Sequence, residues 1–309
     1  MIKVADLKKR YGKVDALSGL SFEVPEGSIY GFVGPNGAGK TTTIRILATL
    51  LVPDSGRAWV CGAEVSDQPG EVRQQLGYMP DFFGVYDNLT ALEYLQFYAA
   101  AHGIRHDKAR KVAMDLLELL DLSAKAADFV DTLSRGMKQR LCLARALVHD
   151  PKVLLLDEPA SGLDPRARVE MRELLKELAD MGKTILVSSH ILSELAELCT
   201  DVGIISNGVM VTSGRVGEVM QRLESSRVLR IRALSGHELA AKLLSQCSGV
   251  TSVTWTEAQV SAAFSGGPDE IRLALKTLVD ADIPVISFSE DKSSLEQVFM
   301  QLTAGSDGR

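Results

Sequence analysis

SIYGFVGPNGAGKT, residues 28–41, determines the fold class of this chain. Its first six residues are an apolar run typical of a buried strand, and helical spacing follows from Thr41 to Leu51. Gly34–Thr41 matches GxxxxGK[ST] between strand and helix, where backbone N–H groups can surround phosphate oxygens. Lys40 would bridge the β- and γ-phosphates, and the Thr41 hydroxyl would hold Mg²⁺. We therefore predict a nucleotide site made of Gly34, Pro35, Asn36, Gly37, Ala38, Gly39, Lys40, Thr41 and Thr42.

Strands and helices alternate after this loop. One continuous apolar stripe, spaced i, i+3, i+4, i+7, predicts a helix at residues 106–122. Buried parallel strands are predicted at 152–157 and 184–188, with helices at 166–181 and 192–199. The polar–apolar alternation of residues 1–30 is typical of antiparallel strands. This order predicts an α/β core with a parallel sheet.

The composition changes near Glu224, Ser225 and Ser226. Beyond that point the order is β-α-β-β-α-β, which predicts a small α+β unit of the ferredoxin-like kind. The expected strands are 228–233, 250–256, 260–264 and 284–289; the expected helices are 237–246, 269–281 and 293–302. We therefore expect one domain at residues 1–224 and a second at 225–309.

Two carboxylates end the apolar strand at 152–157. Asp157 stands at its carboxyl end, the edge that faces the ligand in doubly wound sheets, and could hold Mg²⁺ directly or through water. Glu158 follows and could act as a general base toward an attacking water. A leucine-rich strand can also end in a polar loop by chance, but beside the phosphate loop these acids indicate catalysis.

Composition excludes several classes of protein. The chain has 309 residues, 46% of them hydrophobic, and a formal charge of −6, which argues against nucleic acid as the main partner. Four separated cysteines without a CxxC pair are typical of a reduced, cytosolic protein. No apolar stretch approaches the length of a membrane span, and the N-terminal residues have no signal-peptide pattern. Any membrane role must therefore come through a partner.

The motifs together resemble the ATP-binding cassette (ABC) transporter ATPases over residues 1 to about 220. Residues 133–140, LSRGMKQR, are similar to the family's LSGGQ signature, and residues 161–164, SGLD, to its D-loop. His190 corresponds to the switch histidine, and Tyr11 to the aromatic residue that stacks on adenine. The resemblance implies a P-loop core with antiparallel and helical subdomains, the helical one at about 82–140. Taken alone, His190 could be a core histidine, but its position one strand after the acids favours the family role; Tyr11 could also be a plain surface tyrosine.

The same resemblance implies a mechanism. Two copies would pair head to tail as a homodimer, with ATP and Mg²⁺ between the phosphate loop of one and the signature of the other. Ser134 and the Gly136 N–H would contact the γ-phosphate across the interface, and Asp164 of the D-loop is also expected to be a nucleotide-binding residue. Glu158 would be the catalytic base, and His190 would contact the γ-phosphate. ATP hydrolysis would then power a separate membrane permease.

Three residues depart from the family pattern. Asp81 stands where the family usually has a glutamine that links Mg²⁺ to the permease; it can still ligate Mg²⁺ but adds charge and has no N–H donor. Arg135 and Met137 replace the two commonest signature residues. We expect Asp81 to remain a metal ligand with altered coupling, and a solvated Arg135 is the simplest expectation.

The partner is expected to be a permease of the ABC-2 exporter type, at the cytoplasmic face of the membrane. The C-terminal extension is similar to tails on such ATPases, where dimer support, regulation or a scaffold role are the candidates. Aromatic residues between 78 and 98 could form the groove for a permease helix or simply pack in the core. Of these, we expect Phe82, Phe83 and Tyr86 to lie nearest the partner. The alternatives are a soluble ABC ATPase acting on ribosomes or DNA, and a phosphate-loop kinase or GTPase, although no guanine-reading NKxD is present.

Overall fold

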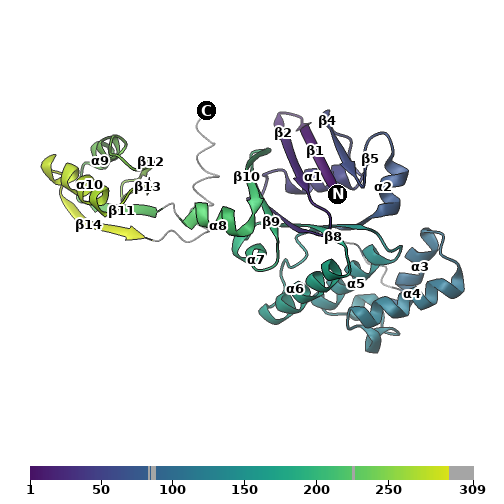
Figure 1. Cartoon of the computed structure of the whole chain (residues 1–309). Helices are drawn as coiled ribbons and strands as arrows, with labels where there is room; N and C mark the ends of the chain where they lie inside the picture. Colours follow the sequence, from purple (N-terminus) through teal and green to yellow (C-terminus); the bar gives the residue numbers. More distant parts are fainter. Residues whose placement is uncertain (83, 85–87, 225–226, 292–309) are drawn as a thin grey trace. The chain divides into compact units, whose positions relative to one another are not determined.

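The computed structural model describes residues 1–82, 84, 88–224 and 227–291 (Figure 1). The chain divides into two compact units, one covering Met1–Val216 and one that begins at Gly217. None of the helices within the described residues is long and apolar enough to cross a membrane.

The first unit contains an antiparallel sheet with the strand order β2-β1-β4-β5. Its strands are β1 (Ile2–Tyr11), β2 (Val14–Val24), β4 (Ser55–Val60) and β5 (Ala63–Glu64). Buried and exposed residues alternate over parts of β1 and β2, as the sequence predicts, but the alternation is interrupted where the register between the two strands shifts near Leu7. The two strands form a hairpin that carries Tyr11 at its turn.

The second sheet of this unit has the order β10-β9-β3-β8-β7-β6, with β10 antiparallel and the other pairs parallel. Its strands are β3 (Ile29–Val33), β6 (Leu76–Met79), β7 (Val153–Asp157), β8 (Thr184–Ser189), β9 (Asp201–Ser206) and β10 (Val209–Arg215). Every residue of β3, β7 and β8 is buried, which explains their unbroken apolar runs. The parallel register pairs Val33 with Ser189 and Asp157 with Ser188, so these ends share one edge.

Helices cover both faces of the parallel sheet. Helix α1 packs against β2, β4 and β7, whereas α6 and α7 pack on β8. Helices α3, α4 and α5 pack on one another. The α-helices are α1 (Lys40–Leu47), α2 (Pro69–Gln75), α3 (Ala91–Ala101), α4 (His106–Leu119), α5 (Arg135–Leu147), α6 (Pro165–Asp180) and α7 (Leu192–Ala196), with short 3₁₀ turns at Ser123–Lys125 and Val130–Thr132.

Helix α1 ends four residues earlier than the expected Leu51. Thr49 adopts a left-handed conformation with φ 62°. Its N–H donates to the Ile46 carbonyl at 2.9 Å, and the Leu50 N–H donates to the Arg45 carbonyl at 2.9 Å. This pair of bonds is a Schellman ending, in which glycine is the usual left-handed residue. Because this position holds a threonine rather than a glycine, the sequence does not indicate that the helix ends here.

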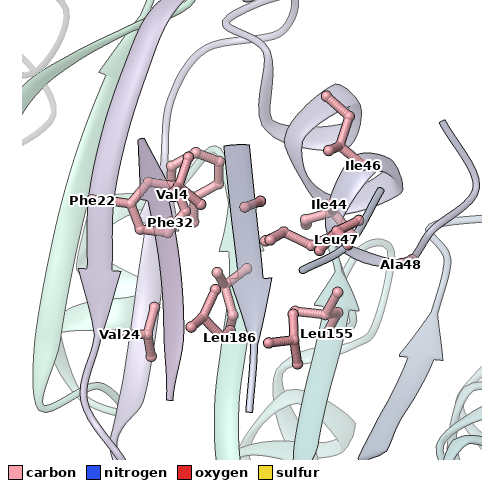
Figure 2. Packing of buried hydrophobic residues seen from close by; sticks show 14 of the residues in the cluster. Val4, Phe22, Val24, Phe32, Ile44, Ile46, Leu47, Ala48, Leu155 and Leu186 are labelled. Carbon is pink, nitrogen blue, oxygen red and sulfur yellow. The ribbon is translucent and has the colours of Figure 1, made fainter. Parts of the chain in front are cut away.

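One hydrophobic core joins the two sheets and α1 (Figure 2). Phe22 of β2 stacks on Phe32 of β3 with ring centroids 5.2 Å apart. Ile44 and Leu47 of α1 are fully buried in the same cluster. Because α1 is anchored by this packing, the loop between β3 and α1 has a defined position relative to the sheet.

The second unit begins with α8 (Val216–Glu224), which crosses the division between the units and was not predicted. The predicted β-α-β-β-α-β order is confirmed in β11 (Arg227–Ala233), α9 (His237–Leu244), β12 (Val250–Trp255), β13 (Val260–Phe264), α10 (Pro268–Asp280) and β14 (Val285–Asp291). All strand pairs are antiparallel in the order β12-β13-β11-β14, a ferredoxin-like arrangement. This sheet has its own core, which includes Leu229, Phe264 and Leu278. The helix expected at 293–302 lies outside the described residues.

Candidate functional site

The loop between β3 and α1 is built on glycines that no other residue could replace without strain. Gly39 precedes the first helical residue with φ 106°, and Gly37 has φ 82°. A Cβ atom at Gly39 would lie 2.6 Å from the Ala16 carbonyl oxygen, and one at Gly34 would lie 2.5 Å from the Ile205 carbonyl oxygen. The loop therefore follows its neighbours closely, and its backbone N–H groups lead directly into α1.

Lys40 is the first residue of α1 and is only 6% exposed. Its Nζ donates to the carbonyl oxygens of Gly34 at 2.7 Å and Pro35 at 3.2 Å. Burial lowers the pKa of Lys40, while the nearby carboxylates of Glu158 and Asp157 oppose that shift. The lysine is thus folded back onto its own loop, in an environment where a phosphate group would favour its charged form.

Asp157 ends β7 with 1% exposure. The Ser188 hydroxyl of β8 donates to its Oδ1 at 2.7 Å, whereas Oδ2 is buried without a hydrogen-bond partner among the described residues. A buried polar oxygen without a hydrogen-bond partner is costly in free energy. The arrangement therefore leaves one carboxylate oxygen available to a ligand.

Glu158 is held in a strained backbone conformation with φ 51°. Its N–H donates to the Ser188 Oγ at 3.0 Å. Its two carboxylate oxygens face different partners: Oε1 is 3.6 Å from the Lys40 Nζ, and Oε2 is 3.0 Å from the His190 Nδ1. The strand end, the phosphate loop and the residue after β8 thus converge on one carboxylate.

A cavity of about 470 Å³ lies over these residues. The predicted site residues that line it are Tyr11, Pro35, Asn36, Gly37, Gly39, Lys40, Thr41, Thr42, Asp81, Glu158 and His190. Tyr11 stands on the β1–β2 hairpin and is 47% exposed, so its ring is accessible to a ligand. Gly34, Ala38 and Asp157 are buried next to the cavity rather than lining it.

Ser134, Gly136 and Asp164 do not line this cavity. Ser134 precedes α5 and accepts a hydrogen bond from the Met137 N–H at 3.3 Å. Asp164 precedes α6 and accepts from the Ala167 N–H at 2.8 Å. Both side chains therefore stabilise helix starts. Within one chain, the signature and the phosphate loop are not brought together.

Sequence reasoning missed Ser188, Val14 and Ala16, and it placed Ser161 in the D-loop without giving it a role in the site. The Ser188 hydroxyl donates to the Asp157 carboxylate and accepts from the Glu158 backbone N–H, and its polar position at the end of an apolar strand could have indicated a role in the site. Val14, Ala16 and Ser161 also line the cavity. Val14 and Ala16 follow Tyr11 across the hairpin, and no chemical feature of an aliphatic side chain could have identified them.

These features define a phosphate-loop ATPase with two carboxylates at a strand end, one buried and one partly exposed to the cavity. The family model of the ABC transporter matches residues 17–161. The chain is 32% identical over 306 residues to the linearmycin resistance ATP-binding protein LnrL of Bacillus subtilis, covering 98% of each chain. It is 36% identical over 304 residues to the daunorubicin/doxorubicin resistance ATP-binding protein DrrA of Streptomyces peucetius, covering 98% of this chain and 92% of DrrA.

Solved structures that resemble this chain are also ATP-binding cassettes of ABC transporters. The ATP-binding subunit of an ABC transporter matches with a TM-score of 0.65 and 31% identity, over 72% of this chain and 92% of that chain. A dimeric cassette in a post-hydrolysis state, MJ0796 bound to ADP and Pi, matches with a TM-score of 0.64 and 25% identity, over 70% and 99%. The chain belongs to the ATP-binding proteins of ABC transporters, in the ABC-2 exporter group, and is an ATPase. The predicted family, fold class and enzymatic activity are confirmed.

Proposed function

We propose that this chain works as a homodimer that hydrolyses Mg²⁺-ATP to power export through a separate ABC-2-type permease. The observation that carries the proposal is the division of the expected nucleotide contacts. Lys40, Glu158 and His190 converge on one cavity, whereas Ser134 and Gly136 lie outside it. A second copy would supply the missing signature contacts, and the dimeric state of the related cassette supports this arrangement.

The contact between Lys40 and Glu158 suggests how binding of ATP prepares the site for hydrolysis. The Lys40 Nζ and the Glu158 Oε1 lie 3.6 Å apart. A γ-phosphate attracts Lys40 and leaves Glu158 free to accept a proton from the attacking water. His190, at 3.0 Å from Oε2, holds the carboxylate and offers its other ring nitrogen to the phosphate.

The donor set also fits Mg²⁺. Among the described residues no cluster of three or more histidine, cysteine or acidic side chains could hold a metal alone. Mg²⁺ commonly uses one or two protein oxygens together with substrate phosphates and water, so this is the expected pattern. The unpartnered Oδ2 of Asp157, the Thr41 hydroxyl and the Asp81 carboxylate are the oxygens available. The ion would neutralise charge on the phosphates during hydrolysis.

The partner is proposed to be a membrane permease at the cytoplasmic face, because LnrL and DrrA are named as resistance ATP-binding proteins. Phe82 is 88% exposed and supports the predicted contact surface, while Tyr94 from the same aromatic segment is buried. Phe83 and Tyr86 lie outside the described residues. The choice of cargo is expected to depend on the permease, because the site in this chain is a nucleotide site.

The proposal is tested with E158Q. Removing the base should block hydrolysis while ATP still binds, so the variant should form a stable, ATP-loaded dimer in size-exclusion chromatography with light scattering. E177Q is the matched control, since Glu177 is an exposed residue of α6, and it should hydrolyse ATP like the wild type. A monomeric E158Q at saturating Mg²⁺-ATP would contradict the dimer. Native protein that fails to remain on detergent-free membranes would contradict the permease partner.

A further inference from the structure

The first turn of α5 rests on the loop at residues 161–164. Gly162 has φ 67°, and a Cβ atom there would lie 2.5 Å from both the Nη1 and the Nη2 of Arg135. Both terminal nitrogens are equally close, so the flat face of the guanidinium covers Gly162. Arg135 is exposed, as the sequence suggested, but its head group lies on this glycine rather than standing free in solvent.

Two further contacts hold the same loop. The Nε2 of Gln139, one turn further along α5, donates to the Ser161 carbonyl at 2.9 Å, and Gln139 is only 4% exposed. Gly136 lies next to Leu163, since a Cβ atom on the glycine would be at ordinary van der Waals distance, 3.5 Å, from the Leu163 Cδ2. Three consecutive residues, Ser161, Gly162 and Leu163, are therefore each in contact with the start of α5.

The positive charge of Arg135 does not stabilise the helix to which it belongs. The first turn of α5 contains no acidic residue, and Arg135 is its first residue. A cation at a helix N-terminus opposes the helix dipole. A planar guanidinium, however, can lie flat on a peptide backbone in a way that the rounded ammonium of lysine cannot. The packing on Gly162 is therefore the structural role that the geometry supports.

The other side of this loop touches the nucleotide site of the same chain. Ser161 lines the cavity, and its N–H donates to the Glu158 carbonyl at 3.0 Å. Arg168 then connects the loop to α7, because its Nη2 donates to the Leu163 carbonyl at 3.2 Å and its Nη1 to Glu194 at 2.5 Å. The loop thus stands between Glu158 and the signature end of α5.

We propose that Arg135 is a positioning residue: its guanidinium clamps the start of α5 to Gly162, and this clamp makes the two nucleotide sites of the dimer respond together. The inference rests on the proposed homodimer, in which Ser134 and Gly136 serve the nucleotide of the other copy. Nucleotide bound in the cavity of one copy orders Ser161 of that copy. The contact between Arg135 and Gly162 then fixes the position of α5 in the same copy. The Ser134 and Gly136 of that copy are therefore already positioned for the nucleotide of the other copy.

The first experiment measures ATPase rate against ATP concentration for the full chain. The wild type should be cooperative, with a Hill coefficient above 1. R135A and R135K should both fall to about 1, with the half-maximal ATP concentration raised about fivefold and kcat changed less than about twofold. R110A, which changes an exposed arginine of α4, should match the wild type. A non-cooperative wild type overturns the proposal. So does an R135K that retains cooperativity, since charge alone would then suffice.

The second experiment needs no dimer. Hydrogen exchange of the nucleotide-free chain should be faster at the Ser161 and Leu163 amides in R135A and R135K, and unchanged in R110A. Equal exchange in all variants refutes the clamp. The two proposals can fail separately. If E158Q stays monomeric with ATP, the dimer is wrong whatever the exchange shows; if E158Q dimerises but R135A keeps the wild-type Hill coefficient, only the coupling through Arg135 is wrong.

Discussion

Ser188 offers the most direct test of how the site is held together. It is fully buried near the end of β8, in register with Asp157 of β7. Its hydroxyl donates to the Asp157 Oδ1 at 2.7 Å and accepts from the Glu158 N–H at 3.0 Å. One small side chain therefore satisfies one polar group on each of the two residues that carry the predicted metal and base roles.

The size of the effect of S188A follows from these two bonds. Alanine leaves a buried carboxylate oxygen and a backbone N–H without partners. A hydrogen bond to a charged group contributes about 1.5–3 kcal/mol, and an orphaned buried donor costs about 1–3 kcal/mol. Allowing for local relaxation, the free energy of unfolding of the first unit should fall by about 2–4 kcal/mol. Glu158 also loses a bond that maintains its φ of 51°, so ATPase activity should fall at least about tenfold.

The assay is urea unfolding followed by tryptophan fluorescence. The chain has two tryptophans, Trp59 in β4 of the first unit and Trp255 in β12 of the second. In a W255F background the signal reports the first unit alone. S193A, which removes an exposed hydroxyl on α7, is the matched control and should change stability little. A loss below about 0.5 kcal/mol for S188A would refute the reasoning.

Two further predictions concern Asp81 and a histidine pair. D81Q removes a carboxylate from the cavity and should raise the Mg²⁺ concentration needed for half-maximal hydrolysis; an unchanged Mg²⁺ titration would count against a metal role. The rings of His102 and His149 stack with centroids 3.9 Å apart, and burial lowers the pKa of both; the charge of His102 adds to this effect at His149. These two histidines therefore bind protons more readily in the unfolded chain than in the folded one, so stability should decline as pH falls below 6.5. The H102Q/H149Q double variant should show a smaller decline. The measurement is the midpoint of urea unfolding at about pH 7.5 and at about pH 5.5. Parallel pH profiles for the two proteins would exclude the pair as its cause.

Local patterns were sufficient for much of the fold. The glycines and Lys40 of the phosphate loop act at fixed offsets within eight residues, so their roles depend on neighbours in the sequence. The α4 stripe and the order of elements in the second unit were predicted for the same reason. Boundaries were less predictable, as the Schellman ending at Thr49 shows.

The sequence by itself determined that this chain forms a phosphate loop between a buried strand and a helix, followed by carboxylates at a strand end, because these are short-range patterns of hydrophobicity and backbone freedom. Only the tertiary structure decided that Ser188 joins Asp157 and Glu158 across 31 and 30 positions, and that Arg135 lies on Gly162. Such contacts depend on strand register and helix packing. A sequence pattern does not encode the distance between two residues that meet only when the sheet and its helices have assembled.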